Sequence, residues 1–289
     1  MVRPFSHYIA IDWSGAKGSR HKNIAMAVAH ADGGPPVLVE RKRGWSRVEV
    51  LEVLRDELQG DSLVGFDLGI SLPFADHSAF FPGWEESPGD AKTLWELIEK
   101  ICSREEDLAA SNFVDHPEAS EFFRRHGSRE GKHFGGGRGR FRVTEHAQAE
   151  QGLKPYSNFN LVGAAQVGKS SLTGMRLLHA LRGRLPVWPI DPLPKFGSVV
   201  VEIYTALAAK AAGRSTSRAK IRDCEELDEA LIALGSAPLG STGPIDDHSA
   251  DALVTAAWLR ANAQRPELWS PKGMTEQIAR TEGWTFGVL

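Results

Sequence analysis

Acidic side chains in this 289-residue chain fall at places from which they could gather around metal ions. Three of them end short apolar segments that are typical of buried strands, namely Asp12, Asp67 and Glu202. Asp247 and Asp251 lie four residues apart in a helical pattern, with His248 between them. That spacing places both carboxylates on one face of a helix.

Clustered carboxylates repel one another unless a cation lies between them, and Mg²⁺ prefers oxygen ligands. Two divalent ions about 4 Å apart can activate water and stabilise the leaving oxygen of a phosphodiester. The acid set therefore predicts a Mg²⁺ or Mn²⁺ site that hydrolyses phosphodiester bonds. A structural alternative stays open, because a strand-end acid is often a turn residue and Asp247 could simply serve the start of its helix.

The elements that must position these acids follow an α/β pattern. Before residue 43, three apolar segments separated by Gly-rich turns predict an antiparallel meander of strands. A helical stripe from Ser46 to Leu58 comes next, followed by a fourth strand that ends at Asp67. One more strand is predicted over residues 199–201, and helices are predicted over residues 91–101, 117–125, 168–184, 227–234 and 246–261.

Four short segments give this pattern a resemblance to a known family. They are residues 9–15 (IAIDWSG), 65–73 (GFDLGISLP), 201–204 (VEIY) and 248–253 (HSADAL). Together with the strand order, they resemble a group described as predicted RNase H-like nucleases, a domain of unknown function. The last segment is also similar to the final catalytic element of RuvC-type resolvases.

The resemblance implies a ribonuclease H-like mixed sheet flanked by helices. It also implies metal ligation by Asp12, Asp67, Glu202 and Asp251, with Asp247 or His248 as a further ligand or outer-shell partner. We therefore expect one domain over residues 1–289, with a helical and loop insertion at about residues 74–160. Thr205 departs from the family pattern, which often has Pro after the Glu strand.

A second motif points to nucleotides. Residues 163–170 match G-x-x-x-x-G-K-[ST] at every fixed position. In a phosphate loop, Lys169 would contact the phosphates and Ser170 the Mg²⁺. The preceding strand pattern is poor and few strands follow, so the motif could instead contact a substrate phosphate or be a tight loop. NTP binding or hydrolysis remains the alternative function, as does a non-catalytic binding module on the same fold.

A basic stretch runs from Arg124 to Arg142, with seven Lys and Arg residues against one acid, Glu130. Glycines at 135–137 favour flexibility. We interpret the stretch as a mobile arm that contacts nucleic-acid phosphates, with Arg138, Arg140 and Arg142 as the candidate contacts. A solvated loop is the alternative.

Composition limits the remaining possibilities. The 34 Lys and Arg against 37 Asp and Glu give a net charge of −3, which excludes a protein that coats nucleic acid through bulk charge. The two cysteines, Cys102 and Cys224, lie far apart, so neither a zinc site nor a disulfide framework is expected. No apolar run of about 18 residues and no signal-peptide pattern is present, so we expect a cytoplasmic protein without a membrane partner.

Overall fold

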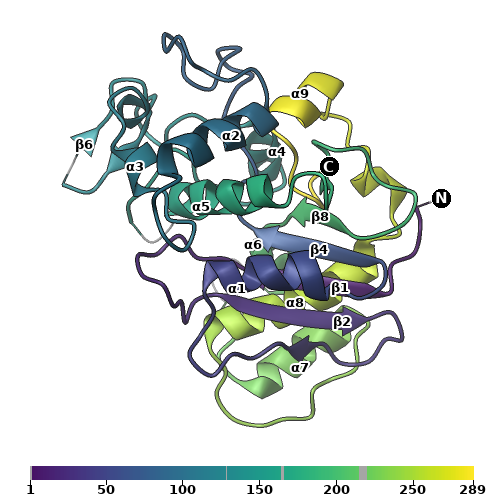
Figure 1. Ribbon diagram of the computed structural model, residues 1–289. Helices are drawn as coiled ribbons and strands as arrows, with labels where there is room; N and C mark the ends of the chain where they lie inside the picture. The colour runs from purple at the N-terminus through teal and green to yellow at the C-terminus, as the bar shows by residue number, and fades with distance from the viewer. Residues whose placement is uncertain (1, 128, 164–165, 215–219) are drawn as a thin grey trace.

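The apolar segments of the chain assemble into a mixed six-stranded sheet with helices on both of its faces (Figure 1). The computed structural model describes residues 2–127, 129–163, 166–214 and 220–289. The strand order is β3-β2-β1-β4-β8-β7. The strands are β1 (His7–Asp12), β2 (Ala25–His30), β3 (Val37–Leu38), β4 (Ser62–Asp67), β7 (Val187–Trp188) and β8 (Val199–Glu202).

Strand pairing confirms the predicted meander and determines on which face of the sheet each strand-end acid lies. β1, β2 and β3 pair antiparallel, whereas β1, β4, β8 and β7 are parallel neighbours. Asp12 lies opposite Asp67 in the β1–β4 register, but Glu202 lies opposite Phe66 in the β4–β8 register. Successive side chains in a strand point to opposite faces of the sheet. Asp12 and Asp67 therefore share one face, and Glu202 points to the other.

Three helices cover the face that carries Asp12 and Asp67. They are α6 (Thr205–Ala211), α7 (Cys224–Ala233) and α8 (Asp247–Asn262), and α8 packs along β1 and β2. The close approach of α8 depends on small residues. At Gly65 a Cβ would lie 2.9 Å from Leu259 of α8 and 2.7 Å from Ile203, so only glycine fits there.

The opposite face is covered by a thicker layer. It includes α1 (Arg47–Glu52), which continues as the π-helical turn η1 (Val53–Glu57), and the packed pair α2 (Ala91–Cys102) and α5 (Val167–Ala180). Most of residues 74–160 belong to this layer or pack against it. They form α2, α3 (Ser111–Val114), the 3₁₀ turn η2 (Ala119–Phe122), the two-stranded ribbon β5 (Arg124–Arg125) with β6 (Arg129–Glu130), and α4 (Val143–Glu150).

The helix predicted over residues 117–125 is wrong in extent, because only η2 forms there. Phe122 and Phe123 are both buried, and the chain turns to an extended conformation at Phe123. Adjacent residues of a helix point in different directions, so a helix with one buried face would have left one of these two rings less buried than the other. The other predicted helices are confirmed within a few residues.

Side-chain caps mark the start of several helices, although α5 has none. Ser46 begins α1, Asp90 begins α2 and Asp246 begins α8, each by accepting a hydrogen bond from a backbone N–H three residues later. Such a cap contributes about 1 kcal/mol. The cap on α8 fixes the helical turn that carries His248 and Asp251.

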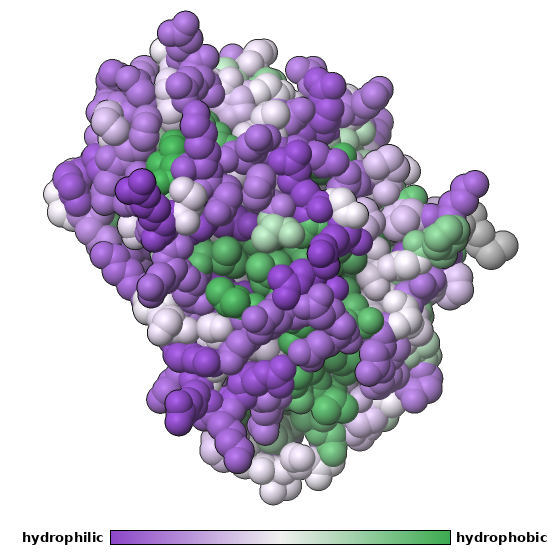
Figure 2. Space-filling view, in the orientation of Figure 1, coloured by the Kyte–Doolittle hydropathy of each residue, from purple (hydrophilic) through white to green (hydrophobic). Residues whose placement is uncertain are grey.

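The C-terminal segment closes the fold through the 3₁₀ turn η3 (Pro266–Leu268) and α9 (Glu276–Thr281). On the face shown in Figure 2, hydrophilic residues surround a smaller apolar area near the middle of the view. None of the described helices is long and apolar enough to cross a lipid bilayer.

Candidate functional site

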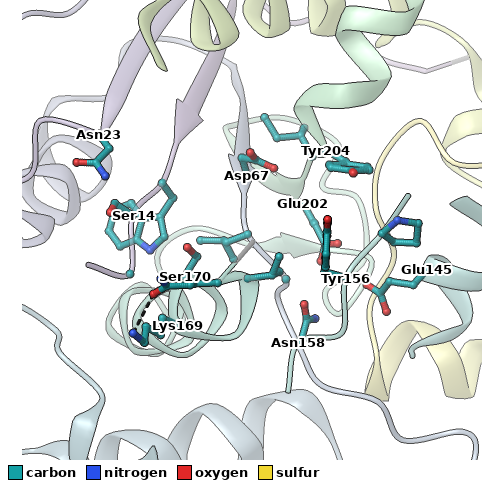
Figure 3. A pocket seen from close by; sticks show the side chains of 18 of the residues that line it. Ser14, Asn23, Asp67, Glu145, Tyr156, Asn158, Lys169, Ser170, Glu202 and Tyr204 are labelled. Carbon is teal, nitrogen blue, oxygen red and sulfur yellow. Dashed lines mark hydrogen bonds between the residues drawn. The ribbon is translucent and has the colours of Figure 1, made fainter. Parts of the chain in front are cut away.

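A cavity of about 450 Å³ opens where β1, β4 and β8 end. Its walls come from the turns after these strands, from the start of α5 and from the end of the 74–160 segment (Figure 3). Asp67 and Tyr204 lie on one side of the cavity, and Lys169 and Ser170 lie across from them. The cavity therefore presents carboxylate and cationic groups to the same space.

Three carboxylates and one imidazole form the acidic side of the site. Asp12 and Asp67 project from neighbouring strands toward α8, which carries His248 and Asp251. His248 Nδ1 lies 2.7 Å from Asp12 Oδ2, and Asp12 is 8% exposed. The strand register and the first turns of α8 thus bring together four of the six residues predicted as metal ligands.

The electrostatics show how closely these acids interact. Burial raises the pKa of Asp12, and the hydrogen bond with His248 partly opposes that rise. Burial and the negative charges of Asp12 and Asp251 hold the pKa of Asp67 well above its usual range. Burial and the charge of Asp12 raise the pKa of Asp251 to about 7. Burial is the largest cause of all three shifts, and the charge of Asp12 further disfavours ionisation of Asp67 and Asp251.

His248 responds in the opposite sense. The hydrogen bond to Asp12 raises the pKa of His248, although its burial acts against that rise. The imidazolium form is therefore favoured beside the Asp12 carboxylate. Within the described part of the chain, no three His, Cys, Asp or Glu side chains are arranged so that they could hold a metal ion.

Glu202 is separated from the other acids. Its carboxylate accepts hydrogen bonds from Arg142 at 2.6 and 2.8 Å, from the Ile70 N–H at 2.9 Å and from the Thr285 hydroxyl at 2.5 Å. These four donors occupy both oxygens. The one-residue offset in register, which aligns Glu202 with Phe66, accounts for this placement. Glu202 is thus a buried structural anchor, and metal ligation by it is disfavoured by its contacts.

Asp247 is paired with a residue outside the cluster, although its charge contributes to the raised pKa of Asp251. Its carboxylate forms an ion pair with Lys220, and its side chain is 29% exposed. The N-cap of α8 is Asp246, whose Oδ1 accepts a hydrogen bond from the Ser249 N–H at 3.0 Å. Asp247 is the first-turn acid of that helix, which matches the structural alternative for it.

Arg140 and Arg142 are buried, and each forms ion pairs with carboxylates inside the fold. They therefore do not belong to a mobile arm. Arg142 is 1% exposed and binds Glu202 and Glu145. Burial acts to lower the pKa of Arg142, but these two carboxylates raise it above its usual value. Arg140 binds both oxygens of Asp76, at 2.6 and 2.8 Å, and donates to the Phe80 carbonyl at 2.7 Å.

Arg138 differs from these two, because it is exposed. Its guanidinium lies 5.5 Å from the ring centroid of Phe141 and 5.7 Å from that of Tyr156, which lines the cavity. It also donates a hydrogen bond to the Pro155 carbonyl. Of the three arginines predicted to contact phosphate, Arg138 is the one that the structure leaves at the surface.

Lys169 and Ser170 lie in the first turn of α5 and line the cavity. Lys169 Nζ donates a hydrogen bond to Gln166 Oε1 at 2.8 Å. Gly15, after β1, packs so tightly here that a Cβ would lie 2.4 Å from the Ser170 nitrogen. Two residues of the predicted phosphate loop, Ala164 and Ala165, fall outside the described residues. Residues 153–159, just before the loop, are in no strand, unlike the strand-to-loop order of a nucleotide-binding P-loop.

Several residues that line or adjoin this cavity were not predicted as site residues from the sequence. The Thr205 hydroxyl lies 3.3 Å from Asp67 Oδ2. Burial, together with the charge of Asp67, raises the pKa of Tyr204 to about 12. Asn158, 1% exposed, donates a hydrogen bond to the Ser71 carbonyl at 2.9 Å. Of these residues, Thr205 is the one that the sequence marks as unusual, because it lies three residues after Glu202, where the resembling family often has Pro.

Comparison of the chain with family models, curated proteins and solved structures yields no match.

Proposed function

We propose that this protein is a divalent-metal-dependent phosphodiesterase that acts on nucleic acid. The observation that carries the proposal is the cluster of Asp12, Asp67 and Asp251, whose pKa values are all raised, at the edge of a cavity that also presents Lys169. The resemblance to RNase H-like nucleases supports it, because that fold also begins with a three-stranded meander followed by a parallel strand. A cytoplasmic location remains part of the proposal.

The donor chemistry of the cluster fits Mg²⁺ or Mn²⁺. Asp12, Asp67 and Asp251 offer hard oxygen donors, and their pKa values are raised first by burial, with the charge of Asp12 adding to the shifts of Asp67 and Asp251. Since no three such side chains of the described residues are arranged to hold a metal ion, these three carboxylates would have to draw together around the ion to bind it. When bound, a divalent ion supplies an activated water and stabilises the leaving oxygen. Glu202 is omitted from the ligand set because both of its carboxylate oxygens already accept hydrogen bonds, two of them from Arg142.

The other side chains would bind and orient the substrate. Lys169 and Ser170 face the acids across the cavity and would hold a phosphate of the substrate. His248, held by Asp12, would keep a proton close to the reacting phosphate. Thr205 would fix the orientation of the Asp67 carboxylate through its hydroxyl.

The test is cleavage of a panel of RNA, DNA, hybrid and branched substrates in Mn²⁺ by the unmodified protein and by Asp12→Asn and Asp251→Asn. Asp32→Asn is a matched control, since Asp32 is exposed in the turn between β2 and β3. We expect cleavage by the unmodified protein and the control and strong loss in the two site variants. If no substrate is cleaved, or if the site variants cleave as well as the control, the proposal fails.

NTP binding is the second candidate, because Lys169 and Ser170 line the same cavity as Asp67. It predicts measurable affinity for ATP or GTP that is lost in Lys169→Ala. Calorimetric titration of the full chain with each nucleotide would decide this, and the absence of binding by the unmodified protein would remove the candidate.

A further inference from the structure

A second cavity, of about 190 Å³, adjoins the acidic one. Gly15, Ala16 and Lys169 line both cavities, so Lys169 lies at the boundary between them. The second cavity lies between the loop after β1, the region of α3, the β5–β6 ribbon and α5. In Figure 1, α3 and the ribbon lie side by side at the left, as the ion pair between Asp115 and Arg125 also indicates.

The walls of this cavity are strongly basic. Its described lining residues include one acid, Asp115, and these basic residues: Lys17, Arg47, Arg125, His126, Arg129 and Lys169. Arg47 is already neutralised, because its guanidinium binds Asp107 at 3.2 Å. The remaining basic groups come from three separate segments of the chain, so the fold itself assembles them.

Two of these groups, Lys169 and His126, lie directly against one another, and Arg125 has an exposed acid as its ion-pair partner. Lys169 Nζ lies 3.4 Å from His126 Nε2, and burial together with the charge of Lys17 lowers the pKa of Lys169. Arg125 lies 3.5 Å from Asp115, whose side chain is 68% exposed. Buried Arg125 Nε has no hydrogen-bond partner among the described residues. Buried polar groups are normally hydrogen-bonded, so Arg125 Nε is a donor that a bound anion could use.

The floor of the cavity is apolar, with Ala110, Val114, Leu161 and Leu172 among its lining residues. A cationic rim above an apolar floor fits an anion that carries an apolar group. A nucleotide has this character, because its phosphate is anionic and its base presents an apolar ring face, whereas inorganic phosphate would leave the floor empty.

We propose that this second cavity binds a phosphate of the nucleic-acid strand next to the one held at the carboxylates. The inference rests on the proposed function, because it takes the strand to pass through the acidic cavity. Lys17, Arg125 and Arg129 contact the neighbouring phosphate, and Lys169 lies between the two positions. This assigns the phosphate contacts to residues other than the buried Arg140 and Arg142.

The test measures binding of fluorescently labelled single-stranded DNA and RNA 10-mers to the full chain in EDTA, by anisotropy over a series of salt concentrations. We expect Lys17→Ala and Arg129→Ala each to weaken binding about tenfold at low salt and to lower the salt slope by about one. Both residues are exposed, so these substitutions leave the core intact. Arg265→Ala and Lys272→Ala are the controls, because both residues are exposed and lie in the segment between α8 and α9, which does not line the cavity.

Binding and salt slopes equal to those of the unmodified protein in both variants would overturn the proposal. A second arm adds ATP as competitor. If the 10-mers do not bind but ATP does, and Lys17→Ala weakens ATP binding, the cavity belongs to a free nucleotide and the proposal is overturned. If excess unlabelled polynucleotide displaces a bound 10-mer and ATP does not, the proposal is supported.

Hydrolysis of bis(p-nitrophenyl) phosphate in Mn²⁺ separates this inference from the proposed function. If the small diester is hydrolysed while 10-mer binding does not depend on Lys17, only the inference fails. If 10-mer binding depends on Lys17 while neither the diester nor any polynucleotide is cleaved, the cavity binds phosphate as proposed and the proposed enzymatic function fails.

Discussion

Replacing Asp251 by Asn should stabilise the metal-free protein at alkaline pH. Burial and the charge of Asp12 raise the pKa of Asp251 to about 7, against about 3.9 for an unfolded chain. Because the folded-state pKa is the higher one, the stability that this carboxyl contributes is fully present below about pH 4. That stability is lost as the pH rises through about 7. Asn keeps the shape of the side chain and cannot ionise, so it avoids this loss.

The size of the effect follows from the shift in pKa. Three pKa units correspond to about 4 kcal/mol at 1.36 kcal/mol per unit, which is an upper limit. Asp251 is only partly buried, so solvent screening reduces the expected value to about 2 kcal/mol. We therefore expect the advantage of Asp251→Asn in the free energy of unfolding to grow from near zero at pH 4 to about 2 kcal/mol at pH 8. For a chain of 289 residues, that corresponds to a rise in Tm of about 3 °C.

The assay is urea and thermal unfolding of both proteins in EDTA at several pH values between 4 and 8. Asp247→Asn on the same helix is the matched comparison, because Lys220 pairs with Asp247 and its loss should not stabilise the protein. If Asp251→Asn lowers the free energy of unfolding equally at every pH, the carboxylates do not repel one another as described. The electrostatic argument for a cation site would then be wrong.

Three further predictions concern other contacts of the site. Arg142→Met should lower the free energy of unfolding by about 3–5 kcal/mol in urea, because it leaves Glu145 and Glu202 buried without a cation, and unchanged stability would contradict the role of this ion pair. Mn²⁺ at a hundred times its Kd should stabilise the unmodified protein by about 2.7 kcal/mol in thermal unfolding, but should not stabilise Asp12→Asn, and equal shifts would place the ion elsewhere. Gly65→Ala should lower Tm, because its Cβ would lie within 3 Å of two side chains, and an unchanged Tm would show that α8 can shift away from the sheet.

Strands β1 to β4 and β8 and the helices α2, α5, α7 and α8 could be predicted from local patterns, because alternation, helical stripes and caps are properties of short segments. The two-residue strands β5, β6 and β7 and the helices α4, α6 and α9 were not predicted. The same patterns placed Asp12 and Asp67 at strand ends, and parallel pairing of β1 with β4 brings them together. The pairing of β4 with β8 could not be predicted in the same way. A one-residue difference in register sends Glu202 to the opposite face of the sheet, and no local signal encodes that offset.

The basic stretch shows a second limit of sequence patterns. Charge counting treats Arg138, Arg140 and Arg142 alike, but their surroundings differ completely. Asp76 lies 64 residues before Arg140, and Glu202 lies 60 residues after Arg142. Such distant partners turn arginines that look solvated into buried ion pairs. In the same way, the cationic cavity joins Lys17, Arg125 and Lys169 from segments that are far apart in the chain.

Mn²⁺-dependent cleavage of a labelled oligonucleotide by the unmodified protein and by Asp67→Asn tests the central claim most directly. Asp67 belongs to the cluster, because the charges of Asp12 and Asp251 raise its pKa. Among the described residues no basic side chain forms an ion pair with Asp67, and its side-chain partner is the Thr205 hydroxyl. The proposed metal site predicts cleavage by the unmodified protein and a loss of about a hundredfold or more in the variant, with its fold retained by circular dichroism. Equal rates for the two proteins, or cleavage that persists in EDTA, would contradict it.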